Sequence, residues 1–216
     1  MGAGSRVCWH VWNALRVAQE IALMRPEPAG SRVALERLSA RYCVSDVATA
    51  LRAAVVSSGV AWRHFVRSGD RVVLKPNLIR QSHTQRPNEW EQIVTHGTVI
   101  EAVAWEVAES LDGHGSITIA DGPQTDSDFD AIDARLGLRD LASRIQSEFN
   151  GVTVSVVDLR RERWRTAGGV VLDRQRVPDA PGGYTEVDLG RLSHFYGRDA
   201  NYYGAECREI YLVLEK

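Results

Sequence analysis

The sequence predicts an α/β fold in which an open, mainly parallel sheet carries helices on both faces, as in doubly wound Rossmann-like proteins. Two observations support this prediction. Three short apolar segments each end at polar residues, and the stretches between them carry apolar residues at helical spacing. A strand–helix–strand–helix–strand order forms right-handed crossovers, and these make neighbouring strands parallel.

Composition indicates a globular domain with no evident macromolecular partner. The chain has 216 residues, of which 44% are hydrophobic and 25% are charged, and its net charge is -2. This balance gives no reason to expect nucleic acid or an anionic membrane as partner. No apolar run approaches the roughly 20 residues that cross a membrane. Cys8, Cys43 and Cys207 lie far apart without C-x-x-C spacing, so we expect a cytoplasmic protein without a cysteine-bound cluster or structural zinc.

The first part of the chain is predicted to be mostly helical. Residues 1–32 are expected to form an N-terminal helical extension, with a helix over about 9–24. A strand is expected over 33–38, at the start of an α/β domain that spans residues 33–159. The next helix is predicted to begin at Asp46, a suitable N-cap residue, and Trp62 is expected to extend its apolar face.

The segment at residues 69–79, GDRVVLKPNLI, is the most informative stretch. Residues 71–75 read as a short buried strand that Pro76 ends, so Lys75 lies at its C-terminal end. Only Lys75 and Lys216 are lysines among 26 lysines and arginines. A compact ammonium differs from a planar guanidinium in charge density and in how readily its pKa shifts, which suggests phosphate, carboxylate or carbonyl chemistry. The alternative is a strand-end lysine that only reaches solvent.

The second strand is predicted over residues 116–120 and is followed by the polar turn DGPQ at 121–124. Before it, residues 78–95 form an irregular stretch that fits an anion-binding loop or lid, or equally a solvated loop. Thr98 and Glu101 fit a capping box that opens the intervening helix. Gly137 is expected to kink or divide the helical region that begins near Ser127.

The third strand is predicted over residues 152–159 and is expected to end near Asp158. From residue 160 onward the pattern decays, and residues 160–216 are expected to be an irregular C-terminal part of the same domain. Three parallel strands with exposed edges suggest a partner chain or a missing C-terminal segment.

Ligands of open parallel sheets bind beyond the carboxyl ends of the strands. The residues that follow the three predicted strands should therefore share one edge, and the loop that enters the first crossover helix should present free N–H groups there, which favour an anion. We expect a small anionic ligand at this edge, with candidate catalytic residues Lys75, Asp121 and His96 and candidate ligand-binding residues Asn77, Thr95, Gly122 and Arg80.

Several common sites are excluded. Asp126, Asp128 and Asp130 alternate like the start of a calcium loop, but Ala131 replaces its glycine and Gly137 its bidentate glutamate. These aspartates are expected to cap the next helix, so calcium is rejected here and no residue of this motif is assigned as a metal ligand. The common phosphate-loop, dinucleotide, nucleophile-elbow and zinc-protease motifs are absent from the sequence. The sequence does not define a cofactor.

Three motifs in order resemble the uncharacterised DUF362 family: GDRVVLKPNL at residues 69–78, Thr95-His96 at a helix start, and ITIADGP at 117–123. The resemblance covers residues 33–159 and implies an α/β domain. Some relatives carry ferredoxin-like cysteines, which this sequence lacks, and Gly97 replaces the usual proline. Relatives also continue into a lysine-rich block that this chain does not contain. If that block completes the site, the resemblance implies that this chain is a fragment or a degenerate member of the family.

Three functional hypotheses follow. The first is an enzyme, or a domain derived from one, in which Lys75 neutralises an anion or polarises a carbonyl, Asn77 binds it, and Asp121 with His96 holds a metal or moves a proton. The second is a non-catalytic accessory or binding domain in a redox or metal-handling system. The third is an inactive truncated family member.

Overall fold

The computed structural model describes residues 33–38, 42–177, 184–188 and 209–213. The predicted extension over residues 1–32, with its helix, lies outside this part. The chain divides into two compact units, one of residues 34–184 with 213–216 and the other of residues 1–33 with 185–212. The first unit contains all the predicted site residues.

A three-stranded parallel sheet forms the centre of this unit. Its strands are β1 (Arg71–Leu74), β2 (Gly115–Asp121) and β3 (Val152–Asp158), in the spatial order β1-β2-β3. Leu74 pairs with Ile119, and Asp121 pairs with Asp158. The three predicted strands and their parallel pairing are therefore confirmed, and their carboxyl ends lie at one edge. The expectation that β1 is buried is wrong, because Val73 is 65% exposed on this outer strand.

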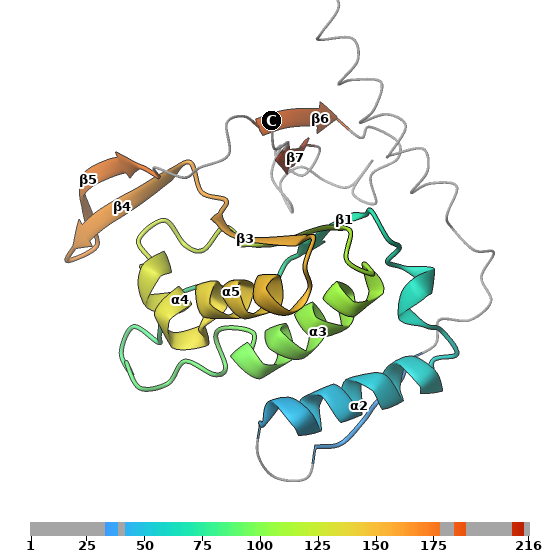
Figure 1. Cartoon of the computed structure of the whole chain (residues 1–216). Coiled ribbons are helices and arrows are strands. Elements are labelled where there is room, and N and C mark those ends of the chain that lie inside the picture. Colours follow the sequence, from blue (N-terminus) through green and yellow to red (C-terminus); the bar gives the residue numbers. More distant parts are fainter. Residues whose placement is uncertain (1–32, 39–41, 178–183, 189–208, 214–216) are drawn as a thin grey trace, which may run out of the picture. The chain divides into compact units, whose positions relative to one another are not determined.

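The core lies between this sheet and the helices that connect its strands. Helix α3 (Gly97–Ser110) joins β1 to β2, and helices α4 (Phe129–Leu136) and α5 (Leu138–Glu148) join β2 to β3. All three lie on the same side of the sheet (Figure 1). Each fully buried aliphatic side chain here contributes roughly 1.5–3 kcal/mol. The most deeply buried members of this core include Val107, Leu111, Ile117, Ile119, Leu138, Leu141 and Ile145.

The doubly wound arrangement is not confirmed, because the described helices of this unit cover one face of the sheet. The opposite face carries hydroxyl groups beside the exposed Val73: Thr118 is half-buried, Ser155 is exposed, and the Ser155 hydroxyl donates to Thr118 Oγ1 at 3.2 Å. The side chains of a strand alternate between the faces, so the apolar positions of β2 and β3 point to the helices and these hydroxyls point away. The fold is α/β, with one helical layer in the described part.

Helix α2 (Val44–Ser57) begins earlier than predicted. Cys43 is its N-cap, and Asp46 lies in the first turn, where a carboxylate favours the helix dipole. Arg52 Nε lies 2.5 Å from Oε1 of the buried Glu106, which joins α2 to α3. Helix α2 ends before Trp62, which starts the short 3-10 helix η1 (Trp62–His64) and packs against the core. Residues 33–38 form no strand, contrary to prediction.

The predicted capping box at the start of α3 is wrong. His96 is the N-cap, and its side chain accepts a hydrogen bond from the Thr98 N–H. The Glu101 carboxylate, which the box would direct to the helix end, instead accepts from Arg144 of α5 at 2.6 Å, and this hydrogen bond raises the pKa of Arg144. The predicted division at Gly137 is confirmed, because this glycine adopts a φ of 67° between α4 and α5.

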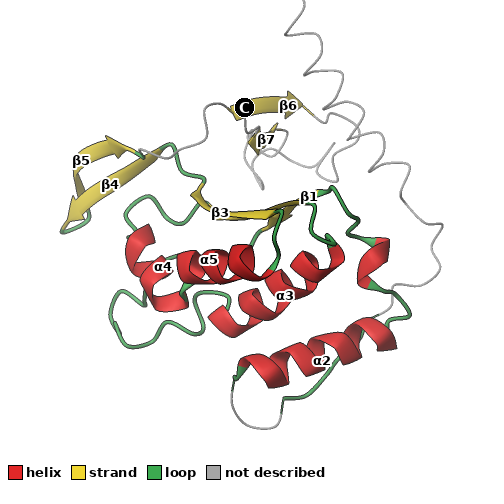
Figure 2. Cartoon of the chain, viewed as in Figure 1, coloured by secondary structure: helices red, strands yellow, loops and turns green. Residues whose placement is uncertain are grey.

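The region after residue 160 is more regular than its sequence pattern indicates. Strands β4 (Glu162–Ala167) and β5 (Val170–Arg176) form an antiparallel hairpin, and Gly168 and Gly169 of its turn both have positive φ angles. Strands β6 (Tyr184–Asp188) and β7 (Glu209–Val213) form a separate two-stranded sheet (Figure 2). Among the described helices, none is long and apolar enough to span a membrane.

Candidate functional site

The ends of β1 and β2 bring Lys75 and Asp121 together. Lys75 follows the last residue of β1, and Asp121 is the last residue of the adjacent parallel strand. Lys75 Nζ lies 2.8 Å from Asp121 Oδ1, and the side chains are 65% and 8% exposed, respectively. The structure therefore places a solvent-facing ammonium on a buried carboxylate at the edge where the sequence predicts a site.

Asp121 also holds the backbone that follows the strand. Its second oxygen, Oδ2, accepts a hydrogen bond of 2.7 Å from the N–H of Leu78, whose side chain is fully buried. Both carboxylate oxygens are therefore engaged. A lysine ammonium has three donors, and Asp121 accepts one of them. Among the described residues no partner is found for its other two donors, which can therefore bind an anion or a carbonyl oxygen.

Asn77 and Thr95 close the base of the loop between β1 and α3. The Asn77 N–H donates to Thr95 Oγ1 at 2.9 Å, and the Thr95 N–H donates to the Asn77 carbonyl at 2.8 Å. These bonds use the backbone of Asn77, and its exposed carboxamide has no hydrogen bond to another described residue. The Asn77 side chain is therefore free to contact a ligand beside Lys75.

An apolar groove of about 290 Å³ lies beside these residues. It runs between the end of β1 and the first turns of α3, so aliphatic side chains form most of its wall. Its polar groups come from Lys75 and Thr95. The groove is lined by Val73, Leu74, Lys75, Pro76, Thr95, Val99, Ile100 and Val103. A small ligand with an anionic end and an apolar body matches this lining.

His96 has a different environment from the one predicted. Its Nδ1 contacts Thr98 Oγ1 at 2.9 Å, and its ring stacks on Tyr42 and Trp90, with centroid separations of 4.6 and 5.6 Å. No contact joins His96 to Lys75 or Asp121 in the described residues. Because the ring caps α3 and is stacked on two aromatic side chains, its position fits a structural role better than proton transfer with Asp121.

Arg80 and Gly122 belong to the surroundings of the loop that follows β2. The Arg80 guanidinium donates to Gln124 Oε1 at 2.8 Å and lies 3.3 Å from Asp126 Oδ2, so it holds the loop after β2. Its charge is already balanced by Asp126. Gly122 is exposed directly after β2, and a Cβ there would make only ordinary contacts with Leu159 and Arg160. Neither residue is placed to determine ligand binding through a side chain of its own.

The sequence analysis missed a buried ion pair at the end of β3. Arg160 Nη2 lies 2.6 Å from Asp158 Oδ2, and both side chains are buried. Arg160 Nη1 also donates to the carbonyls of Gln124 and Ser127, at 2.8 Å each. Asp158 is thus at the expected edge but is fully paired. Arg160 lies in a run of arginines, and no spacing in the sequence distinguishes it from its neighbours.

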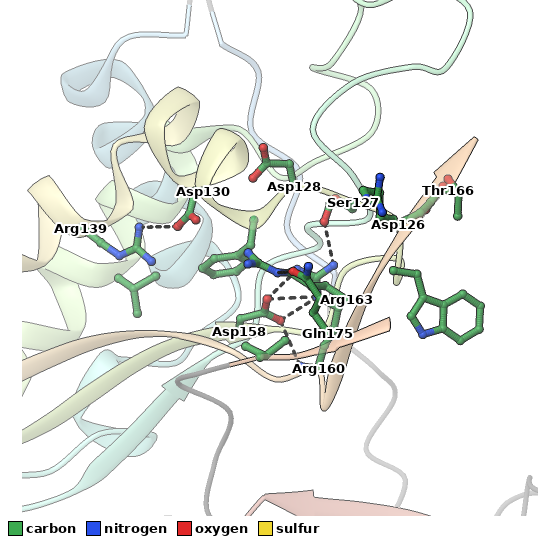
Figure 3. A pocket seen from close by; sticks show the side chains of 15 residues that line it. Asp126, Ser127, Asp128, Asp130, Arg139, Asp158, Arg160, Arg163, Thr166 and Gln175 are labelled. Atoms are coloured by element: carbon green, nitrogen blue, oxygen red, sulfur yellow. Dashed lines mark hydrogen bonds and ion pairs between the residues drawn. The ribbon is translucent and has the colours of Figure 1, made fainter. Parts of the chain in front are cut away.

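A second cavity lies between this ion pair, the start of α4 and the β4–β5 hairpin (Figure 3). Sequence analysis did not predict it, because the hairpin that forms one wall was not predicted. In the described residues, no group of three or more histidine, cysteine, aspartate or glutamate side chains is arranged to hold a metal ion.

Comparison with known proteins yields no relative. The chain matches no protein-family model, no curated protein and no solved structure.

Proposed function

We propose that this chain binds a small anionic molecule with an apolar body at the ends of β1 and β2. The observation that carries the proposal is the Lys75–Asp121 pair of 2.8 Å beside the apolar groove. Asp121 fixes the ammonium at the mouth of the groove, and the remaining donors of Lys75 bind the carboxylate or phosphate of the ligand. The side chains of Asn77 and Thr95 supply further polar contacts.

The arrangement favours binding over acid–base catalysis by Asp121. A general base must be free to accept a proton from the substrate. Both Asp121 oxygens already accept hydrogen bonds, and His96 is stacked and engaged with Thr98. The role proposed for Asp121 is therefore to orient Lys75.

We also propose that the resemblance to the DUF362 family reflects a shared site. The three motifs that carry the resemblance contact one another: Lys75 of the first pairs with Asp121 of the third. Asn77 of the first forms hydrogen bonds with Thr95 of the second. Residues far apart in the chain thus form one cluster at the sheet edge, which supports a common functional role.

Thermal unfolding with model anions tests the proposal. Benzoate and phenyl phosphate carry the predicted combination of charge and apolar body, and benzyl alcohol is the uncharged control. We expect the two anions, but not the alcohol, to raise the melting temperature, because a ligand that binds only the folded state stabilises it.

Lys75→Ala is expected to weaken binding of these anions about tenfold or more, the loss that corresponds to one charge-assisted hydrogen bond. Arg86→Ala is the matched control, since it removes an exposed cation whose contact is with Glu89 in the same loop. Equal responses of the two variants, or a wild-type protein that does not distinguish benzoate from benzyl alcohol, would contradict the proposal.

A further inference from the structure

A cavity away from the Lys75 site has the size of a small-molecule site. It measures about 680 Å³, within the roughly 300–1,000 Å³ typical of ligand pockets. The end of β3 and the start of α4 form one side, and the β4–β5 hairpin forms the other (Figure 3). Phe129, Val156 and Trp164 provide apolar lining among the charged groups.

Most charges around this cavity are already paired. Asp158 binds Arg160, Asp130 lies 3.1 Å from Arg139, and Asp126 lies 3.3 Å from Arg80. Burial lowers the pKa of Arg139, but its hydrogen bonds and charge interactions with Asp130 and Asp133 outweigh this effect and raise the pKa, so this guanidinium stays charged. These pairs make the wall formed by β3 and α4 close to neutral.

The hairpin supplies the charges that remain. Arg163 and Arg165 of β4 line the cavity, and neither forms an ion pair with a carboxylate among the described residues. Arg163 Nε donates to Gln175 Oε1 at 3.2 Å, which leaves its two terminal nitrogens free. The remaining carboxylate, Asp128, uses Oδ1 to cap α4 at the Ala131 N–H. Two guanidinium groups therefore face the cavity against one carboxylate.

The hairpin holds these arginines in fixed relation to the cavity. Residues two apart on a strand point to the same face, so Arg163 and Arg165 act together. Between them, the backbone N–H of Trp164 donates to the Thr125 carbonyl at 2.7 Å and so joins β4 to the loop before α4. The pairing register shifts between Arg165 and Thr166, and such a bulge changes the direction of neighbouring side chains.

We propose that this cavity binds a small molecule through a phosphate group held by Arg163 and Arg165. Two planar guanidinium groups match the charge of a phosphate dianion and can each donate two parallel hydrogen bonds to its oxygens. The apolar lining accommodates the organic part of the ligand. This site is separate from the groove at Lys75 and does not depend on the function proposed there.

Calorimetric titration of the full chain with pyrophosphate tests this inference. The double variant Arg163→Gln/Arg165→Gln is expected to weaken binding of pyrophosphate at least tenfold. Arg174→Gln/Arg176→Gln removes the same charge from β5, where neither side chain lines the cavity, and is expected to change binding less than twofold. The comparison is repeated in the Lys75→Ala background, which removes the ammonium of the groove, so that the effect of the double variant is assigned to the hairpin arginines.

Several outcomes would overturn the inference. Equal weakening by the two double variants would show that the anion binds the basic hairpin without a defined site. Absence of pyrophosphate binding by the wild-type protein would also contradict the proposal. Both cavity arginines are exposed, so the fold should tolerate their removal. If the double variant fails to fold, the single variant Arg165→Gln is titrated in its place, because the Arg165 side chain has no partner among the described residues.

Discussion

Asp121 combines two roles through the two oxygens of one carboxylate. Oδ1 binds the exposed ammonium of Lys75, and Oδ2 accepts the N–H of Leu78 in the buried interior. The two bonds differ in energetic importance. An ion pair with an exposed partner contributes about 0–1 kcal/mol. A buried N–H left without a partner costs about 1–3 kcal/mol. Asp121 therefore affects stability mainly through Leu78 and ligand binding mainly through Lys75.

Asp121→Ala is expected to lower the free energy of unfolding by about 1–3 kcal/mol, because the Leu78 N–H loses its acceptor. Asp121→Asn keeps an oxygen for this bond and should lose less. Lys75→Ala should cost under about 1 kcal/mol. Urea unfolding of the three variants measures these differences. A loss in Lys75→Ala as large as that in Asp121→Ala would contradict the division of roles.

The close approach of another backbone segment explains why residue 97 is a glycine. Gly97 is the first residue of α3, and a Cβ built there would lie 2.9 Å from the Leu136 carbonyl oxygen at the end of α4. This distance is shorter than side chains tolerate next to a backbone atom. Glycine at this position therefore lets the end of α4 approach the start of α3.

Gly97→Ala is expected to destabilise the protein by about 1–3 kcal/mol, the usual cost of forcing additional atoms into a packed region. Gly122→Ala is the matched control, because its Cβ would lie 3.8 Å from the nearest atom, Leu159 Cβ. The control should be neutral or stabilising by up to about 1 kcal/mol, since alanine restricts the unfolded chain. Chemical unfolding measures the free energy of unfolding of both variants. Equal changes would show that the contact with Leu136 does not determine the effect of Gly97→Ala.

The ion pair of Arg160 and Asp158 joins the end of β3 to the loop before α4, because Arg160 also binds carbonyls of that loop. Arg160→Ala is expected to destabilise the protein by about 3–5 kcal/mol, since it leaves a buried carboxylate unpaired. Arg160→Lys should recover only part of this loss, because an ammonium lacks the planar fork that contacts Asp158 and the carbonyls together. Thermal and urea unfolding measure both variants. Full stability in Arg160→Lys would contradict the importance of the fork.

Across the whole described unit, the sheet was the most predictable feature. The strands at residues 71–74, 115–121 and 152–158 are short apolar runs bounded by glycine turns, and these signals are local. The proximity of Lys75 and Asp121 follows from parallel pairing alone. The sequence therefore located the edge of the sheet and the central pair of the candidate site.

The features that sequence reasoning missed depend on contacts between distant segments. Most of the hairpin strand at residues 162–167 is exposed, so no alternation of apolar and polar residues marks it. His96, rather than Thr98, is the N-cap of α3, and Glu101 is engaged by Arg144, a partner 43 positions away. Arg80 is paired with Asp126, 46 positions away. Arg160 pairs with the nearby Asp158, but its other hydrogen bonds go to the carbonyls of Gln124 and Ser127 in a distant loop.

The central claim is that the Lys75 ammonium, held by Asp121, binds an anion at the mouth of the groove. The chain contains two lysines, so selective ¹³C labelling of lysine side chains gives two εCH₂ signals in an NMR spectrum, with Lys216 as the internal reference. Lys75→Arg assigns the pair by removing one signal.

Titration of the labelled protein with benzoate is the measurement that tests this claim. We expect the Lys75 signal to shift and saturate, while the Lys216 signal stays in place and benzyl alcohol leaves the Lys75 signal unchanged. Parallel movement of both signals, or a Lys75 signal that benzoate does not affect, would contradict the claim.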